Sequence, residues 1–161
     1  GIRLHREIDK FTDTHPLVKI SQSYLRPTFG HYSTVITDIF FDHFLAKHWE
    51  RYSEIPLEIF ALNTYHSLEK HLPELPLQFG EMFYWMKTQN WLLHYRELEG
   101  IQRTLNGMTR RAKFDSKMNE STLFLVEKES EFEVIFFAFF KDLETFAKEK
   151  LSEIRQLHDR H

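Results

Sequence analysis

The chain has 161 residues, a formal net charge of −3 and no cysteine. Its length suits one domain, and the absence of cysteine excludes disulfides, thiolate catalysis and cysteine-ligated zinc. The nearly balanced charge argues against nucleic acid as an obligate partner, because such binding needs a concentrated basic surface. No apolar run reaches the roughly 18 residues that suggest a membrane span, so we expect none. We also expect a cytoplasmic protein.

Hydrophobic residues repeat mainly at helical spacing, and only five glycines and five prolines interrupt them. This pattern predicts an all-α fold, which we take to be a single-domain helical bundle over residues 1–161. The predicted helices cover about residues 1–13, 17–25, 31–52, 56–71, 79–86 and 91–105, and one or two long helices follow from about residue 122.

Three local features refine this prediction. Asn106-Gly107 is typical of the end of a helix, and the polar stretch 113–120 predicts a loop. The apolar run 134–140 suits either a strand or a helix, because a short apolar run does not distinguish the two. Its helix-like flanks favour a helix.

Two helical pairs carry the clearest chemistry. His5 and Asp9 are four residues apart, as are Asp38 and Asp42, so each pair shares one face of its helix. Imidazole and carboxylate groups are ligands for Mn²⁺, Mg²⁺, Zn²⁺ or iron, and such a metal ion can generate hydroxide and bind a phosphoryl oxygen. The two faces together therefore predict a divalent-metal site of a hydrolase.

Each pair also has a plainer interpretation. His5 and Asp9 suit an exposed pair on an amphipathic helix, and a carboxylate of the second pair could instead bind an arginine. His43 directly follows Asp42 and points about 100° away from it, so it could be a general acid, a hydrogen-bond donor behind the ligands, or a partly buried histidine without a catalytic role.

Arginines gather between residues 96 and 111. Arg96 and Arg103 lie seven residues apart and share a helical face, and Arg110 and Arg111 follow. Such a basic patch could attract an acidic protein or a phosphate ester, although a run of charge is more often a solvated face.

Four motifs occur in an order that resembles the acyl carrier protein phosphodiesterase family. They are His5-Arg6-Glu7-Ile8-Asp9, Asp38-Ile39-Phe40-Phe41-Asp42-His43, Trp91-Leu92-Leu93-His94-Tyr95-Arg96 and Leu105-Asn106-Gly107-Met108, and the match covers roughly residues 1–113.

The resemblance implies a helical fold related to the HD-type metal-dependent phosphohydrolases. It also implies hydrolysis of the phosphodiester between 4'-phosphopantetheine and a serine of holo-acyl carrier protein, with Mn²⁺ or, alternatively, Mg²⁺. On this resemblance His5, Asp9 and Asp42 become the metal ligands, and Asp38 and His43 take catalytic or supporting roles. The candidate residues for docking the acidic carrier protein are Arg96, Arg103, Arg110 and Arg111.

Family members carry a further segment ahead of the His-Arg-x-x-Asp motif, and we expect that residues of the first helices are missing here. Two other functions stay open from the sequence. One is hydrolysis of a nucleotide or another phosphoester by an HD-type enzyme, and the other is a helical binding module without catalysis.

Overall fold

A computed structural model describes residues 2–160, and the side chains of residues 3–160. Within these residues all regular structure is helical, and no strand is present, which confirms the all-α prediction. The contacts divide the chain into two compact units, and the single-domain prediction stays a prediction. Unit 1 contains residues 1–37 and 123–161, and unit 2 contains residues 38–122.

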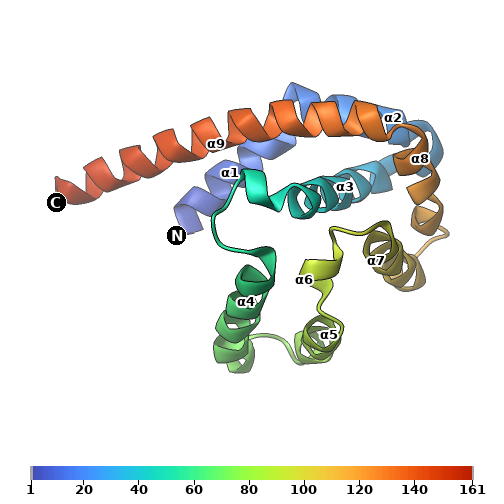
Figure 1. Cartoon of the computed structure of the whole chain (residues 1–161), viewed down its shortest axis with the longest axis horizontal. Coiled ribbons are helices and arrows are strands. Elements are labelled where there is room, and N and C mark those ends of the chain that lie inside the picture. Colours follow the sequence, from blue (N-terminus) through green and yellow to red (C-terminus); the bar gives the residue numbers. More distant parts are fainter. Residues whose placement is uncertain (1, 161) are drawn as a thin grey trace. The chain divides into compact units, whose positions relative to one another are not determined.

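The α-helices are α1 (Ile2–Thr14), α2 (Pro16–Phe29), α3 (Ser33–Lys47), α4 (Leu57–His71), α5 (Leu77–Thr88), α6 (Trp91–His94), α7 (Leu98–Arg111), α8 (Thr122–Glu127) and α9 (Glu129–Asp159) (Figure 1). Short 3-10 helices lie at Gly30–Tyr32, Trp49–Arg51, Leu72–Glu74 and Met118–Glu120.

In unit 1, the long helix α9 packs along α1 and α2 (Figure 1). Phe132, Phe136 and Phe139 are buried on α9 whereas Val134 is exposed, which is the helical period and not the alternation of a strand. The helix prediction for residues 134–140 is therefore confirmed. Phe11 of α1 stacks on Phe146 of α9, with ring centroids 4.3 Å apart.

His15 fixes the junction between α1 and α2. Its Nδ1 accepts a hydrogen bond from the backbone N–H of Leu17 at 3.1 Å, so it caps the first turn of α2. Its Nε2 then carries the proton and donates to Asp142 of α9 at 3.0 Å. One side chain thus connects three helices of unit 1.

In unit 2, α4, α5 and α6 enclose a small core made by Ala61, Tyr65 and Phe83. The Tyr65 hydroxyl donates to Asn90 Oδ1 at 2.8 Å and accepts from the backbone N–H of Leu92 at 3.1 Å. These bonds hold the turn between α5 and α6, where Asn90 adopts the left-handed conformation with φ 51°. The predicted break between the helices at residues 79–86 and 91–105 is confirmed, although α5 continues to Thr88.

Several predicted helix limits were wrong. The helix expected over residues 91–105 is two helices, α6 and α7, because the chain turns sharply after His94. A Cβ atom at Gly100 would lie 2.0 Å from the His94 carbonyl oxygen, so this turn requires glycine.

Asn106-Gly107 does not end a helix, since α7 continues to Arg111 and Gly107 has no positive φ. The Gln102 side-chain amide donates to Asn106 Oδ1 at 2.8 Å one turn along α7 and supports the helix there.

The second helix was predicted too short, and the third too long. Helix α2 passes through Pro27 and ends only at Phe29, which is buried, before Gly30 with φ 57°. Helix α3 ends at Lys47, and a 3-10 turn replaces its predicted last part.

Candidate functional site

Asp38 and Asp42 lie one turn apart on α3, in the part of that helix that belongs to unit 2. The pKa of Asp42 is raised from its ordinary 3.8 to about 7, first by desolvation and then by the negative charge of Asp38. Both side chains nevertheless keep contact with solvent. Asp42 therefore has crowded but not sealed surroundings, and a cation placed at this pair would relieve the repulsion between the carboxylates.

His43 is the next residue of α3, and only 6% of it is exposed. Its Nδ1 lies 2.7 Å from the backbone carbonyl oxygen of Tyr95. A carbonyl oxygen only accepts hydrogen bonds, so Nδ1 carries the proton and donates. In the neutral ring Nε2 then has no proton and can accept one or bind a metal ion. The bond to Tyr95 selects the tautomer that such chemistry needs.

Tyr95 was missed as a site residue in the sequence analysis. It lies between α6 and α7 in unit 2, and its side chain forms a hydrogen bond with Thr104. Burial raises the pKa of the Tyr95 hydroxyl, the bond with Thr104 lowers it, and the charge of Asp42 raises it further. Its place in the Trp91–Arg96 motif was a signal, but a tyrosine next to an arginine does not reveal which backbone group holds His43.

His5 and Asp9 form a different kind of pair in unit 1. His5 Nε2 lies 3.2 Å from Asp9 Oδ2, and the two side chains are 78% and 60% exposed. This arrangement is what the plainer interpretation, a surface pair on an amphipathic helix, expects.

The structure places the two members of each pair one turn apart on their own helix, the pair His5–Asp9 in unit 1 and the pair Asp38–Asp42 in unit 2. Among residues 2–160, no group of three or more His, Asp or Glu side chains is placed to hold a metal ion. That one ion binds His5, Asp9 and Asp42 therefore stays a prediction.

Arg96 differs from the other predicted docking arginines. Its Nη1 lies 3.3 Å from Glu58 Oε1, and its Nε lies 3.8 Å from Glu97 Oε1. Two carboxylates therefore already offset its charge.

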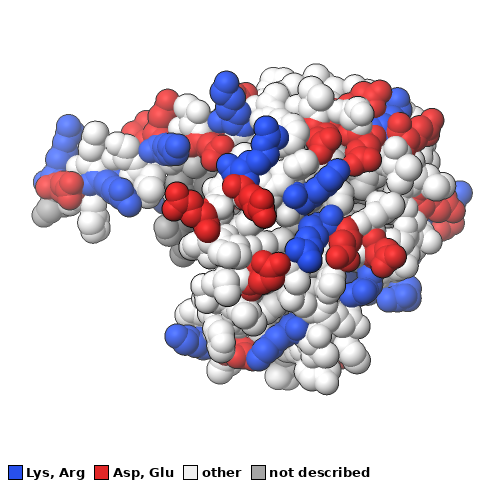
Figure 2. All heavy atoms as spheres, viewed as in Figure 1, with Lys and Arg blue, Asp and Glu red and all other residues white. Residues whose placement is uncertain are grey.

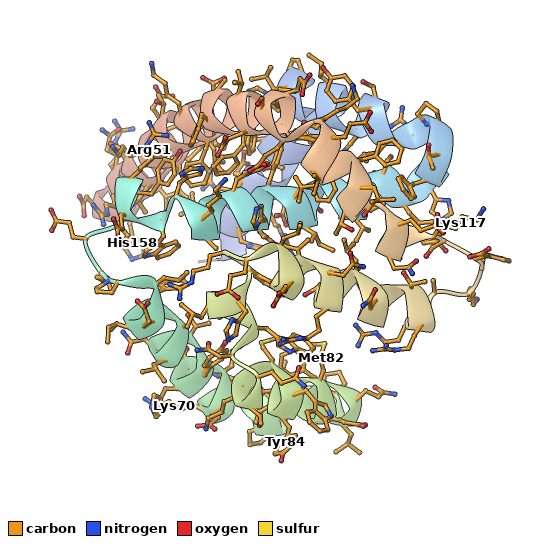
Figure 3. All side chains as sticks on the ribbon, turned by 45° about the vertical axis from the view of Figure 1, so that its right-hand side comes forward. Arg51, Lys70, Met82, Tyr84, Lys117 and His158 are labelled. Carbon is orange, nitrogen blue, oxygen red and sulfur yellow. The ribbon has the colours of Figure 1, made fainter. Side chains whose placement is uncertain are left out.

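The other three arginines, Arg103, Arg110 and Arg111, lie on α7 and line a cleft of about 900 Å³ in unit 2. The opposite wall is α5, where Met82 lies on the side that faces α7 and Tyr84 points the other way (Figure 3). The space-filling view shows both basic and acidic side chains over the region of α7, with mainly uncharged surface around α5 (Figure 2). The cleft thus combines a basic wall with an apolar one.

The family model described as acyl carrier protein phosphodiesterase matches residues 1–143. The chain belongs to this family. All nine site residues predicted from the sequence, from His5 to Arg111, fall inside the matched region.

Three proteins named acyl carrier protein phosphodiesterase illustrate the similarity. The one from Enterobacter sp. is 37% identical over 118 residues, which are 72% of this chain and 61% of that protein. The one from Klebsiella pneumoniae subsp. pneumoniae is 31% identical over 151 residues, 93% of this chain and 78% of that protein. The one from Pectobacterium atrosepticum is 30% identical over 149 residues, 92% of this chain and 77% of that protein.

The chain thus spans 61% of the length of its Enterobacter relative in the phosphodiesterase family. No solved structure matches it. Within residues 2–160, no helix is both long and apolar enough to cross a membrane.

Proposed function

We propose that this protein hydrolyses the phosphodiester that joins 4'-phosphopantetheine to a serine of holo-acyl carrier protein, giving the apo-protein, and that the reaction depends on a divalent metal ion. Membership of the phosphodiesterase family supports the reaction class. The observation that carries the proposal is the Asp38–Asp42 pair, in which desolvation and then the charge of Asp38 raise the pKa of Asp42.

The donor atoms of this pair fit the metal ion that the family resemblance implies. Carboxylate oxygens suit hard cations such as Mn²⁺ and Mg²⁺, and a cation at Asp38 and Asp42 would favour the ionised form of both. When bound, the ion would polarise the phosphoryl group and lower the pKa of a water molecule. The roles of His5 and Asp9 as further ligands stay predictions.

His43 would move a proton in this reaction. Because Nδ1 is held by the Tyr95 carbonyl oxygen, Nε2 is the atom that can take a proton from water or return one to the leaving serine oxygen. The backbone bond keeps the ring in one orientation without adding a charge. Asp38 would add a second negative charge beside Asp42, and the two carboxylates together would attract a cation more strongly than one.

The arginines of α7 would attract the carrier protein. An acidic partner gains most from basic groups that no neighbouring carboxylate offsets, and Arg103, Arg110 and Arg111 meet this condition better than Arg96. Electrostatic attraction of this kind raises the association rate and weakens with salt.

The proposal is tested by incubating holo-acyl carrier protein with this protein and Mn²⁺, and by measuring released 4'-phosphopantetheine by mass spectrometry. We expect Asp42→Ala to lower the rate on the order of 100-fold or more, as loss of metal-site groups does. Asp115→Ala, which removes an exposed carboxylate from a loop of the same unit, serves as the control. Full activity of Asp42→Ala would refute the role of the pair.

Two other outcomes would replace the proposal. Turnover of nucleotides or simple phosphodiesters in preference to the carrier protein would favour an HD-type phosphohydrolase with another substrate. Binding of the carrier protein without a bound metal ion and without release would favour a helical binding module.

A further inference from the structure

Two guanidinium groups of α7, those of Arg110 and Arg111, converge on one place in the cleft. A methyl group at Gly107 would lie 3.6 Å from Nη2 of Arg111 and 3.9 Å from Nη2 of Arg110. Both side chains thus reach back along the helix over Gly107, and Arg103 lies one turn before this glycine on the same cleft wall. Because glycine has no side chain, the space between the guanidinium groups is not filled from below.

The positive charge of these three arginines is not offset by a carboxylate in contact with them among the described residues of unit 2. Within the described part of the chain, neither Arg103, Arg110 nor Arg111 forms an ion pair, whereas Arg96 contacts two carboxylates. Glu81 is the acidic residue among those that line the cleft. Guanidinium groups that meet at one point suit a single anion with several oxygens, since each can donate two parallel hydrogen bonds to phosphate.

The wall opposite the arginines is apolar. Phe79, Met82 and Trp85 of α5 line it together with Trp91, and Trp85 is 46% exposed. These side chains offer contact area but almost no hydrogen bonds, so they suit the uncharged part of a ligand. The cleft volume of about 900 Å³ is enough for an extended small molecule, since ligand sites measure about 300–1,000 Å³.

We propose that the cleft between α5 and α7 binds a phosphate ester with a long, largely uncharged arm, the phosphate at Arg103, Arg110 and Arg111 and the arm along the aromatic wall. The inference rests on the proposed function for the identity of the ligand, which would be the released product 4'-phosphopantetheine, whose phosphate no longer joins the serine. Convergence at Gly107 favours one phosphate over the carboxylates of an acidic helix, which are spread along its surface.

The cleft is also connected to the Asp42 region through side chains of unit 2. Thr104 lines the cleft and forms a hydrogen bond with the side chain of Tyr95, whose carbonyl oxygen holds His43. A ligand in the cleft would therefore contact Thr104, the neighbour of the residue whose carbonyl oxygen holds His43. This connection gives the cleft a way to affect the reaction without containing the reacting atoms.

The matched pair of 4'-phosphopantetheine and pantetheine, which differ only by the phosphate, tests the proposal. Each is titrated into the full chain by isothermal calorimetry with EDTA present, so that neither metal binding nor hydrolysis is required. We expect 4'-phosphopantetheine to bind at least about tenfold more tightly, as expected from charge-assisted hydrogen bonds. This difference should shrink as salt increases.

The double variant Arg110→Gln/Arg111→Gln should lose most of this preference, and Arg155→Gln on α9 of unit 1 should keep it. Gly107→Glu is a second variant, which places a carboxylate beside the guanidinium groups and should also abolish the preference. Circular dichroism confirms that each variant is folded. Equal affinity for the two ligands, or an unchanged preference in both cleft variants, would overturn the proposal.

A helical peptide rich in glutamate and leucine separates the cleft proposal from protein docking. If this peptide binds in the cleft more tightly than 4'-phosphopantetheine and displaces it, the cleft is a docking site for an acidic helix and our inference is wrong. If 4'-phosphopantetheine binds but holo-acyl carrier protein is not hydrolysed, the inference holds and the proposed function fails. If holo-acyl carrier protein is hydrolysed but 4'-phosphopantetheine binds no more tightly than pantetheine, the proposed function holds and the inference fails.

Discussion

The pairs His5–Asp9 and Asp38–Asp42 share the same spacing on a helix but have different surroundings. On α1 the histidine and the aspartate contact each other at 3.2 Å and are largely exposed. On α3 two like charges lie in a crowded region, and the pKa of Asp42 rises to about 7. Spacing of four residues therefore determines which side chains meet, whereas the surrounding protein determines their chemistry.

The neighbours on the two helices explain this difference. The residue after Asp42 is the buried His43, which is held by the Tyr95 carbonyl oxygen. Tyr95 lies in the turn between α6 and α7. Among the described residues of unit 1, no comparable hydrogen bond holds the α1 pair, and the polar connection to α9 runs through His15. The α3 pair is thus supported by distant parts of the sequence, and the α1 pair is local.

The largest effect on this comparison should come from Gly100→Ala. The added methyl group would lie 2.0 Å from the His94 carbonyl oxygen, so the turn that carries Tyr95 must shift. We expect a loss of about 3 kcal/mol in the free energy of unfolding, at the upper end for an overpacked site. Urea denaturation measures it, and Gly80→Ala, whose methyl group meets nothing within 4 Å, is the matched control.

The Gly100→Ala substitution should also have a local structural effect, in addition to its effect on the free energy of unfolding. The NMR signal of the His43 ring should change in Gly100→Ala, because its hydrogen-bond partner moves, while the signals of His5 should not. A variant as stable as the wild type would contradict the close approach of Gly100 to His94.

Helical periodicity in the sequence predicted most of the fold. It placed α1, α4 and the long C-terminal helix near their observed limits, because each has a continuous apolar face. Periodicity failed where contacts between residues far apart in the sequence determine the limits of a helix. Asn106-Gly107 has the composition of a helix end, but α7 continues to Arg111, and its residues Gln102 and Thr109 on either side of this pair form hydrogen bonds with the backbone of Asn119.

For the candidate site, the sequence predicted which residues share a helical face but not their surroundings. The pair Asp38–Asp42 could be recognised from spacing, whereas the desolvation that raises the pKa of Asp42 and the bond between His43 and Tyr95 depend on the folded surroundings. The same limit applies to the arginines. Spacing could not show that Arg96 is offset by Glu58 while the arginines further along α7 line a cleft.

A smaller effect is expected from Asp42→Asn in protein kept free of metal by EDTA. The folded-state pKa of Asp42, about 7, lies above its ordinary 3.8, so the folded protein binds this proton more tightly than the unfolded chain. The ionised carboxylate therefore costs stability above pH 7, and the cost disappears as the pH falls towards 4. Asp42→Asn should be the more stable protein at pH 8, by less than about 1 kcal/mol because solvent reaches the side chain.

Thermal denaturation at pH 8 and pH 4.5 measures this difference, and Asp9→Asn serves as the control from the other pair. Added Mn²⁺ should reverse the order at pH 8, because it stabilises only the protein that keeps both carboxylates. A wild type that is more stable than Asp42→Asn at pH 8 in EDTA would show that Asp42 is favourably paired there.

The smallest effects should come from His5→Ala and Asp9→Ala. Their contact is exposed, and pairs of this kind contribute about 0.5 kcal/mol or less, so the free energy of unfolding should change by no more than that in either variant. Denaturation in urea measures it, with His15→Ala as the contrasting case, since that change removes a helix cap and the bond to Asp142. A loss above about 1 kcal/mol would show that the α1 pair has tertiary partners. If the folding of His5→Ala and Asp9→Ala is unaffected, as expected, a loss of Mn²⁺ affinity in these variants would be due to the loss of the predicted metal ligands.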